Sequence, residues 1–160
     1  MNTEFPWQDP LVIDHCQQLC WSFHHWLKRP LYDQILPHHS PPEVAQLLFE
    51  APFALLSHGI EPDPVLNYGN QVVLDLWQMD WATLIRTPSR LTAEPEAQSR
   101  RQQLLTQAES EGYLTNYSGI RISALGTRFA IANVTIWNVV TSHHQRLGQA
   151  AIFRDWQFMA

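Results

Sequence analysis

Residues 63–81, DPVLNYGNQVVLDLWQMDW, join an apolar run, an Asn-Tyr-Gly-Asn turn and a helical pattern that carries tryptophan. The run 65–68 is typical of a short strand, and the glycine after it ends the strand. Asn70 can cap a helix that carries apolar residues at helical spacing, and Asp80 can cap a second short helix. The stretch therefore predicts a corner at which the chain turns from a strand into two short helices.

Gly69 lies where a phosphate-binding loop would place a glycine, after a strand and before a helix. A single glycine gives neither the Gly-x-Gly-x-x-Gly pattern of dinucleotide-binding folds nor the Walker pattern. We therefore interpret Gly69 as a residue that the geometry of the turn requires.

The chain before this corner is predicted to begin with helices. Asp9 and Pro10 form an N-cap and a first helical position, and the helix that they open ends before Pro30. A second helix is predicted at about 42–51, and a short buried strand at 53–58. The first helix carries an apolar stripe at helical spacing, formed by Val12, Cys16, Leu19, Cys20, Phe23, Trp26 and Leu27.

The chain after the corner contains one long helix and three strands. Residues 95–112 form the clearest helical pattern, with an apolar stripe and Gly112 as C-cap. Strand-like runs follow at roughly 113–123, 127–140 and 147–157, and their short connections predict an antiparallel meander. The stripe of the helix consists of Ala97, Leu104, Leu105 and Ala108.

The middle strand run, RFAIANVTIWNVV, is apolar on both of its alternating faces, so something must cover each side of the sheet. The helices between residues 70 and 111 can cover one face, and the N-terminal helices can cover the other. We therefore predict an α+β fold, in which a five-stranded antiparallel sheet carries short helices on one face and the N-terminal helices against the other.

Composition and net charge restrict the class of protein to which the chain can belong. A chain of 160 residues suits one domain, and a net charge of −5 with a single lysine, Lys28, gives no basic field for nucleic acid. No apolar run approaches the roughly 20 residues that span a bilayer, and the acidic start lacks the basic region of a signal peptide. We expect a cytoplasmic protein with neither a nucleic-acid nor a membrane partner.

The order of two strands, short helices, a longer helix and a three-stranded meander is that of the PAS fold, and particular residues resemble the MEKHLA domain family. The resemblance covers residues 50–158 and rests on NYGN with LDLWQMDW, then PSRLTAEP, YSGIRIS, the Gly-x-Arg-Phe of 126–129, TIWNV and GQAAIFRDW. Domains of that family are PAS-like and occur as the C-terminal part of certain plant homeodomain leucine-zipper transcription factors and as separate bacterial or algal proteins. The resemblance implies a stand-alone PAS-like domain at 52–160 behind an N-terminal helical extension at 1–51.

One position departs from the wider PAS pattern. Arg154 and Asp155 resemble its terminal Asp motif, but Trp156 stands where PAS chains usually continue with Ile-Thr. The chain stops four residues later, which leaves no length for the helical linker that would carry a signal into a fused enzyme. We expect any output to pass through a surface.

The resemblance implies a pocket between the short helices and the sheet. Period two places Phe129, Asn133 and Trp137 on one face of their strand, without showing which face points inward. If Asn133 is buried, its side-chain amide either forms hydrogen bonds with protein groups, which we favour, or binds a ligand. The candidate lining residues are Trp77, Tyr117, Phe129, Asn133 and Trp137.

Arginines are the candidates for recognising a charged ligand. Arg90, Arg121 and Arg128 can each bind a carboxylate or phosphate group in bidentate fashion. We favour the alternative that they are exposed and paired with acids such as Glu94.

Cofactor chemistry finds little support in the sequence. Haem needs an axial ligand, and no histidine lies between His58 and His143, although Met79 is a remote candidate. Photochemical flavin capture needs a pocket cysteine, and both cysteines belong to the first helix. The first helix also carries three possible metal ligands at spacings of four residues, Cys16, Cys20 and His24. We favour the alternative that these residues pack in the core.

Three functions remain. The leading hypothesis is a PAS-like sensory or regulatory module that binds a small organic ligand and acts through a homodimer or partner surface. Trp21, Phe23 and Trp26 are candidates for that surface, or equally for packing on the chain's own sheet. The second is a small cone-shaped α+β enzyme with an apolar cavity, which would place most of its strands after its helices. The third is a protein-interaction domain with a filled core. No catalytic motif is present, so we favour a non-enzymatic function.

Overall fold

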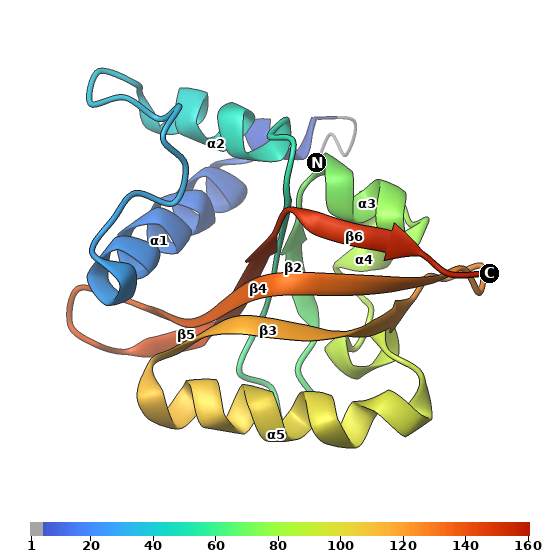
Figure 1. Cartoon of the computed structure of the whole chain (residues 1–160). Helices are drawn as coiled ribbons and strands as arrows, with labels where there is room; N and C mark the ends of the chain where they lie inside the picture. The colour runs from blue at the N-terminus through green and yellow to red at the C-terminus, as the bar shows by residue number, and fades with distance from the viewer. Residues whose placement is uncertain (1–4) are drawn as a thin grey trace.

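The computed structural model describes residues 5–160 and confirms the predicted α+β architecture (Figure 1). The N-terminal elements are η1 (Pro6–Gln8), α1 (Pro10–Leu27) and α2 (Pro41–Phe49). The remaining elements are β1 (Ala54–His58), β2 (Leu66–Gly69), α3 (Gln71–Trp77), α4 (Trp81–Leu84), η2 (Ser89–Thr92), α5 (Pro95–Glu111), β3 (Tyr113–Ile122), β4 (Arg128–Val140), β5 (Arg146–Phe153) and β6 (Asp155–Phe158).

The sheet is antiparallel throughout and its strands lie in the order β2-β1-β5-β4-β3. β6 also pairs with β4, beside the first half of that strand. The predicted last strand run is therefore interrupted at Arg154 and forms two strands, which adds a sixth strand to the five predicted.

The corner at residues 63–81 depends on a buried asparagine. Asn70 is fully buried and caps α3 by accepting from the backbone N–H of Val73. The same side chain accepts from Leu55 N–H and donates to the carbonyls of Leu48 and Phe53 at 3.1 and 2.7 Å. Asn70 therefore joins β1, α2 and α3 in one hydrogen-bonded corner.

Gly69 is required by packing rather than by an unusual backbone angle. A Cβ atom at this position would lie 2.8 Å from side-chain carbons of both Leu84 and Val73. The absence of a side chain lets α3 and α4 approach the end of β2. The prediction that Gly69 has a geometric role thus acquires a specific cause, which is the close approach of two helices.

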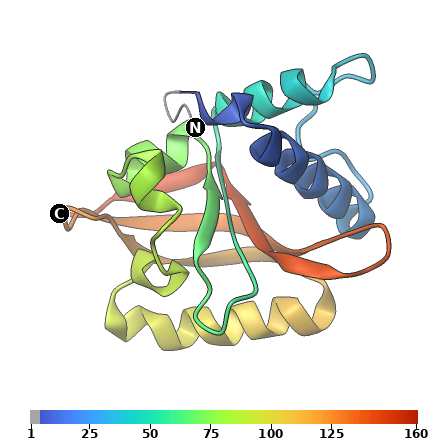
Figure 2. The same ribbon diagram turned by 180° about the vertical axis from the view of Figure 1, so that it is seen from behind.

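Helices cover both faces of the sheet (Figures 1 and 2). α1 packs on β4, and α2 packs on α1. α5 lies along β3 and β4 on the opposite side, and α3 and α4 pack beside β1 and β2. One continuous hydrophobic core contains residues from α1, α2, α3, α5 and the sheet.

The strand β4 contains an irregularity that changes which residues face the core layers. Asn133 has a φ of 55°, in the left-handed region, and its side chain is exposed and donates to Asp155 at 2.9 Å. Left-handed backbone interrupts the alternation of a strand. Ile131 therefore faces α5, whereas Trp137 packs edge-on against Phe23 of α1, with their ring centres 5.0 Å apart. The prediction of one common face across Asn133 was wrong for this reason.

Candidate functional site

A cavity of about 50 Å³ lies between α5, η2, the end of α3 and the sheet. A water needs roughly 10–15 Å³ measured in this way, so the cavity can hold a few small atoms. Much of its wall is apolar, and several polar side chains project into it. The lining residues are Leu56, Ser57, His58, Leu66, Trp77, Ser89, Thr92, Arg101, Leu105, Tyr117, Arg121, Ile131, Val134, Ile136, Gln149, Ala150, Ala151 and Phe153.

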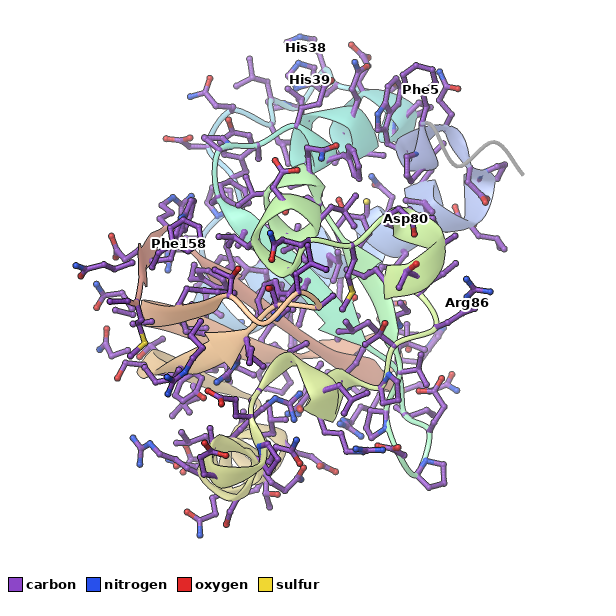
Figure 3. The ribbon with its side chains drawn as sticks, turned by 90° about the vertical axis from the view of Figure 1, so that its right-hand side faces the viewer. Phe5, His38, His39, Asp80, Arg86 and Phe158 are labelled. Atoms are coloured by element: carbon purple, nitrogen blue, oxygen red, sulfur yellow. The ribbon has the colours of Figure 1, made fainter. Side chains whose placement is uncertain are left out.

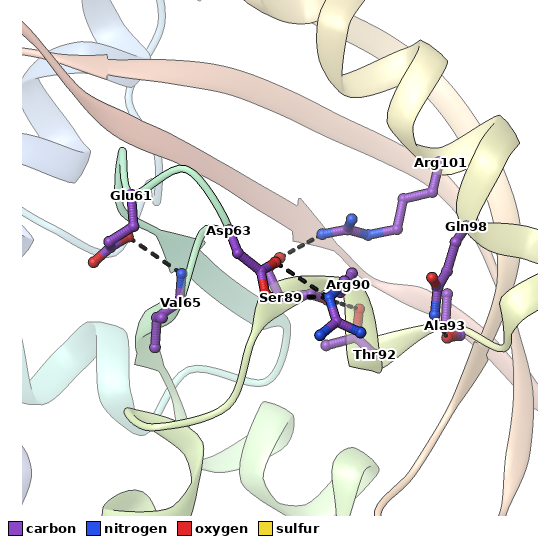
Figure 4. Close-up of polar contacts among 9 residues, drawn as sticks. All are labelled: Glu61, Asp63, Val65, Ser89, Arg90, Thr92, Ala93, Gln98 and Arg101. Atoms are coloured by element: carbon purple, nitrogen blue, oxygen red, sulfur yellow. Dashed lines mark hydrogen bonds and ion pairs between the residues drawn. The ribbon is translucent and has the colours of Figure 1, made fainter.

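Arg101 brings a positive charge to the cavity from α5. Its side chain reaches toward η2 and donates a hydrogen bond to the hydroxyl of Ser89 (Figure 4). Only 7% of the residue is exposed. Burial lowers the pKa of Arg101 to about 10, helped by the nearby charge of Arg121 and opposed by Tyr117. The guanidinium therefore remains charged at neutral pH inside the fold.

Arg121 approaches the cavity from β3 as part of a compact group. Its Nη2 donates to the Tyr117 hydroxyl at 2.6 Å, and its Nη1 donates to the carbonyl of Ile120 at 2.9 Å. Gly119 lies between the two side chains, and a Cβ atom there would be 2.7 Å from the Tyr117 hydroxyl. The glycine thus gives the tyrosine and the arginine room to lie side by side.

His58 places an unpaired polar atom at the cavity. Its Nδ1 is 2.9 Å from the carbonyl of Gly59, which only a protonated Nδ1 can satisfy. Burial lowers the pKa of His58, and the charges of Arg101 and Arg146 contribute. The neutral ring leaves Nε2 as an acceptor, and this buried atom has no partner among the described residues. The cavity therefore contains unmet hydrogen-bonding capacity.

No acidic side chain neutralises the two cavity arginines within residues 5–160. The ion pairs formed there are Arg90 with Asp63, Arg128 with Glu94 and Arg146 with Glu109. Arg101 and Arg121 take part in none of them, and their hydrogen bonds go to hydroxyl and carbonyl oxygens. The cavity therefore has a net positive charge that protein groups do not compensate.

The predicted lining residues divide into two groups. Trp77, Tyr117 and Arg121 line the cavity, and Phe129 lies behind Trp77 with a ring separation of 5.0 Å. The others lie elsewhere: Asn133 is exposed and Trp137 faces α1, because the irregularity in β4 separates them from the cavity, and Arg90 is at the surface with Asp63.

The preference for surface roles held for two of the three arginines. Arg90 and Arg128 are half-exposed and paired with acids, as that alternative stated, and Arg128 has the predicted Glu94 as its partner. The prediction of a surface role was wrong for Arg121, because only 7% of this residue is exposed. Arg121 lies on the same face of β3 as Tyr117, toward the cavity.

The prediction from the sequence missed several polar residues of the cavity, among them His58, Gln149 and the charged Arg101. The apolar stripe of its helix was taken from Ala97 to Leu104, Leu105 and Ala108. Position 101 fills the gap in that stripe, four residues after Ala97 and four before Leu105. A charged residue within a buried helical stripe was the signal that could have identified it.

The volume of the cavity bears on the size of a ligand. Pockets for drug-sized ligands measure about 300–1,000 Å³, far more than the space found here. The lining residues include no cysteine, because Cys16 and Cys20 belong to α1, where burial raises the pKa of both thiols to about 12. His58 does line the cavity.

Clusters of metal ligands and helices able to span a membrane are absent from the part of the chain that the structure describes. Residues 5–160 contain no group of three His, Cys, Asp or Glu side chains that could hold a metal ion. His38 and His39 lie at the outer edge of the fold before α2 (Figure 3), far from the cavity. None of the helices in this part of the chain is long and apolar enough to cross a membrane.

Solved structures with the same fold are numerous, and their sequences are distant. A PAS domain from Colwellia psychrerythraea has a TM-score of 0.60 at 16% identity, covering 69% of this chain and 92% of its own. A light-oxygen-voltage domain studied with a flavin analogue has a TM-score of 0.58 at 13% identity, covering 73% and 84%. An RNA-binding light-oxygen-voltage receptor has a TM-score of 0.64 at 15% identity, covering 78% of this chain but 35% of its own. These similarities show a PAS-like fold.

The family comparison is more specific. Among curated proteins, none matches this chain significantly. The model of the MEKHLA domain matches residues 13–158, a range that begins within α1 and ends at the last residue of β6. The chain belongs to the MEKHLA domain family.

Proposed function

We propose that this chain is a cytoplasmic sensory or regulatory module that binds a small organic ligand in the cavity beneath α5 and acts through a partner protein or a second copy. The observation that carries the proposal is a cavity with a largely apolar wall and several converging polar groups. Such a combination is the usual form of a small-molecule site. The PAS-like fold of the family supports a sensory role.

A hydrogen-bonded connection leads from the cavity to α1. Gln149 lines the cavity and donates to the side-chain oxygen of Asn138 at 3.3 Å and to the carbonyl of Leu105 at 2.8 Å. The backbone carbonyl of Asn138 accepts from the indole N–H of Trp26 at 2.9 Å. A ligand that moves Gln149 would therefore also move Asn138, whose backbone carbonyl binds Trp26 of α1.

The proposed output surface is the exposed side of α1. Phe23 is buried against the sheet and cannot belong to that surface, whereas Trp26 is half-buried and its indole N–H is bound to Asn138. Leu11 and Trp21 remain exposed, at 75% and 40%, and Trp21 stacks on His25. A shift of α1 would change the position of these apolar groups relative to the rest of the fold.

The alternatives differ in what they expect of the cavity. A protein-interaction domain with a filled core would hold only water there. The cone-shaped enzyme would place most strands after its helices, whereas β1 and β2 precede α3. That order supports the sensory module over the enzyme.

Native mass spectrometry of the chain purified from cells tests the proposal. We expect a fraction of the protein to carry a small non-covalent adduct that is lost on denaturation. A thermal-shift screen with metabolites should then identify compounds that stabilise the fold by binding its native state. Only the bare chain mass, together with a silent screen, would favour the interaction domain.

A further inference from the structure

We propose that the cavity recognises a small aliphatic carboxylate, whose charged end is held between Arg101 and Arg121 and whose hydrocarbon end contacts the apolar wall. This inference rests on the proposed function and names the chemical class of its ligand. Both arginines are more than nine-tenths buried and line the same cavity.

The first step of the argument is charge. Arg101 and Arg121 approach the cavity from α5 and β3, and the charge of Arg121 acts unfavourably on the charge of Arg101. Two buried like charges are unfavourable unless an opposite charge accompanies them. No carboxylate of residues 5–160 pairs with either side chain. An anionic ligand would supply the missing charge.

The second step is the supply of hydrogen-bond donors. Each guanidinium has five N–H groups in a planar fork that matches the two oxygens of a carboxylate. Arg101 donates to Ser89, and Arg121 donates to Tyr117 and Ile120, which uses a minority of those groups. The remaining donors are available for a ligand.

The third step is size and polarity. The volume of about 50 Å³ corresponds to roughly three to five water-sized positions, which suits an acid of about two to four carbons. Leu105, Ile131 and Phe153 form an apolar part of the wall. A carboxylate with a short alkyl chain would bind the arginines with its charged end and contact the apolar wall with its alkyl chain. Inorganic phosphate would leave the apolar wall without a contact.

Binding of propionate tests the proposal, with propionamide as a neutral compound of nearly the same shape. Isothermal titration and thermal shift are measured for both at equal ionic strength, balanced with sodium chloride. We expect propionate to bind and to raise Tm, propionamide to have no effect, and inorganic phosphate to bind more weakly than propionate. Equal effects of propionate and propionamide, or tighter binding of phosphate, would overturn the proposal.

Two arginine variants provide the matched comparison. Arg101→Met removes a cavity charge, and Arg90→Met removes an arginine that lies close by in Figure 4 but is exposed and paired with Asp63. We expect Arg101→Met to raise the Kd for propionate at least tenfold and Arg90→Met to leave it unchanged. The same Kd in both variants would contradict the assignment.

A third variant tests the proposed carboxylate site if Arg101→Met fails to fold. Gly119→Ala adds a methyl group that must displace the Tyr117 hydroxyl and the Arg121 guanidinium, which would lie 2.7 and 3.0 Å away. The affinity for propionate should fall severalfold, and an unchanged affinity would refute the role of Arg121. If native mass spectrometry finds a neutral metabolite bound in place of an acid, the sensory function stands and the carboxylate assignment falls.

Discussion

The two faces of the sheet contrast in how they use their buried polar groups. On the face covered by α1, the Ser22 hydroxyl donates to the carbonyl of Val140 and accepts from its N–H, both at 2.8 Å, beside the close pair of Phe23 and Trp137. On the face covered by α5, the guanidinium groups of Arg101 and Arg121 have no acidic partner among residues 5–160. Within the described part of the chain, both faces retain unpaired polar atoms, which on the α1 side are the Tyr68 hydroxyl and the Trp137 indole N–H. The difference is charge, because the α5 side holds two buried guanidinium groups that a ligand can use.

The largest expected effect comes from breaking the α1 face. Phe23→Ala removes a ring that is 1% exposed and packs on Trp137, so the free energy of unfolding should fall by about 3–5 kcal/mol. Urea unfolding followed by circular dichroism measures the change. Leu11→Ala on the same helix is the control, because Leu11 is 75% exposed and its truncation should cost less than about 0.5 kcal/mol. Equal costs for the two variants would show that α1 does not pack as described.

The pH dependence of stability probes the same face. Burial lowers the pKa of His15 from 6.5 to about 4, while its Nε2 lies 2.8 Å from the Ser57 hydroxyl. A lowered folded-state pKa means that the contribution of the neutral ring is complete above pH 6.5 and is lost as the pH falls toward 4.

His15→Gln should remove this dependence. Between pH 7 and pH 4.5 the wild-type chain should lose about 2 kcal/mol more stability than the variant does. Urea unfolding at both pH values measures the difference. His38→Gln, at an exposed position, should behave as the wild type does, and the same behaviour in His15→Gln would mean that His15 is not buried in its neutral form.

A smaller effect tests the connection between the two faces. Trp26→Phe keeps an aromatic ring but removes the indole donor to the carbonyl of Asn138. The expected loss of stability is about 1 kcal/mol, the usual net value of one hydrogen bond. Amide hydrogen exchange should show faster exchange in the second half of α1. Unchanged exchange there would remove the proposed link from Gln149 to that helix.

The smallest effect is expected at the surface. Arg90 and Asp63 form an ion pair in which both side chains are about half exposed. Exposed pairs contribute about 0–1 kcal/mol, so Arg90→Ala should change the free energy of unfolding by less than about 0.5 kcal/mol. Chemical denaturation at low and high salt measures this. A loss above 1 kcal/mol would show that Arg90 contributes more to the stability of the fold than an exposed ion pair does.

Much of the fold could be predicted because local signals and tertiary packing agree. The caps at Asp9, Asn70 and Asp80 accept from their helices as predicted, and the doubly apolar β4 is covered on both sides. The break at Arg154 was not predicted, because no glycine or proline marks it within residues 149–158. It lies opposite the irregularity at Asn133 in the paired strand β4, and the sequence does not show this long-range correspondence.

The site was less predictable than the fold for a physical reason. Whether Phe129 and Trp137 share a face depends on one left-handed residue between them, and a one-residue shift moves every later side chain to the other side. Arg121 and Arg128 lie on neighbouring strands and look alike in sequence, yet one is buried and the other pairs with Glu94. Only the register of the sheet separates them.

A crystal structure of the chain purified from cells, without added organic acids, tests the central claim most directly. The electron density between Arg101 and Arg121 is the quantity to inspect. The account predicts a small flat group that contacts both guanidinium groups, with its other end against Leu105 and Ile131. Density for water alone, with the two arginine side chains turned out to solvent or paired with an acid, would contradict it.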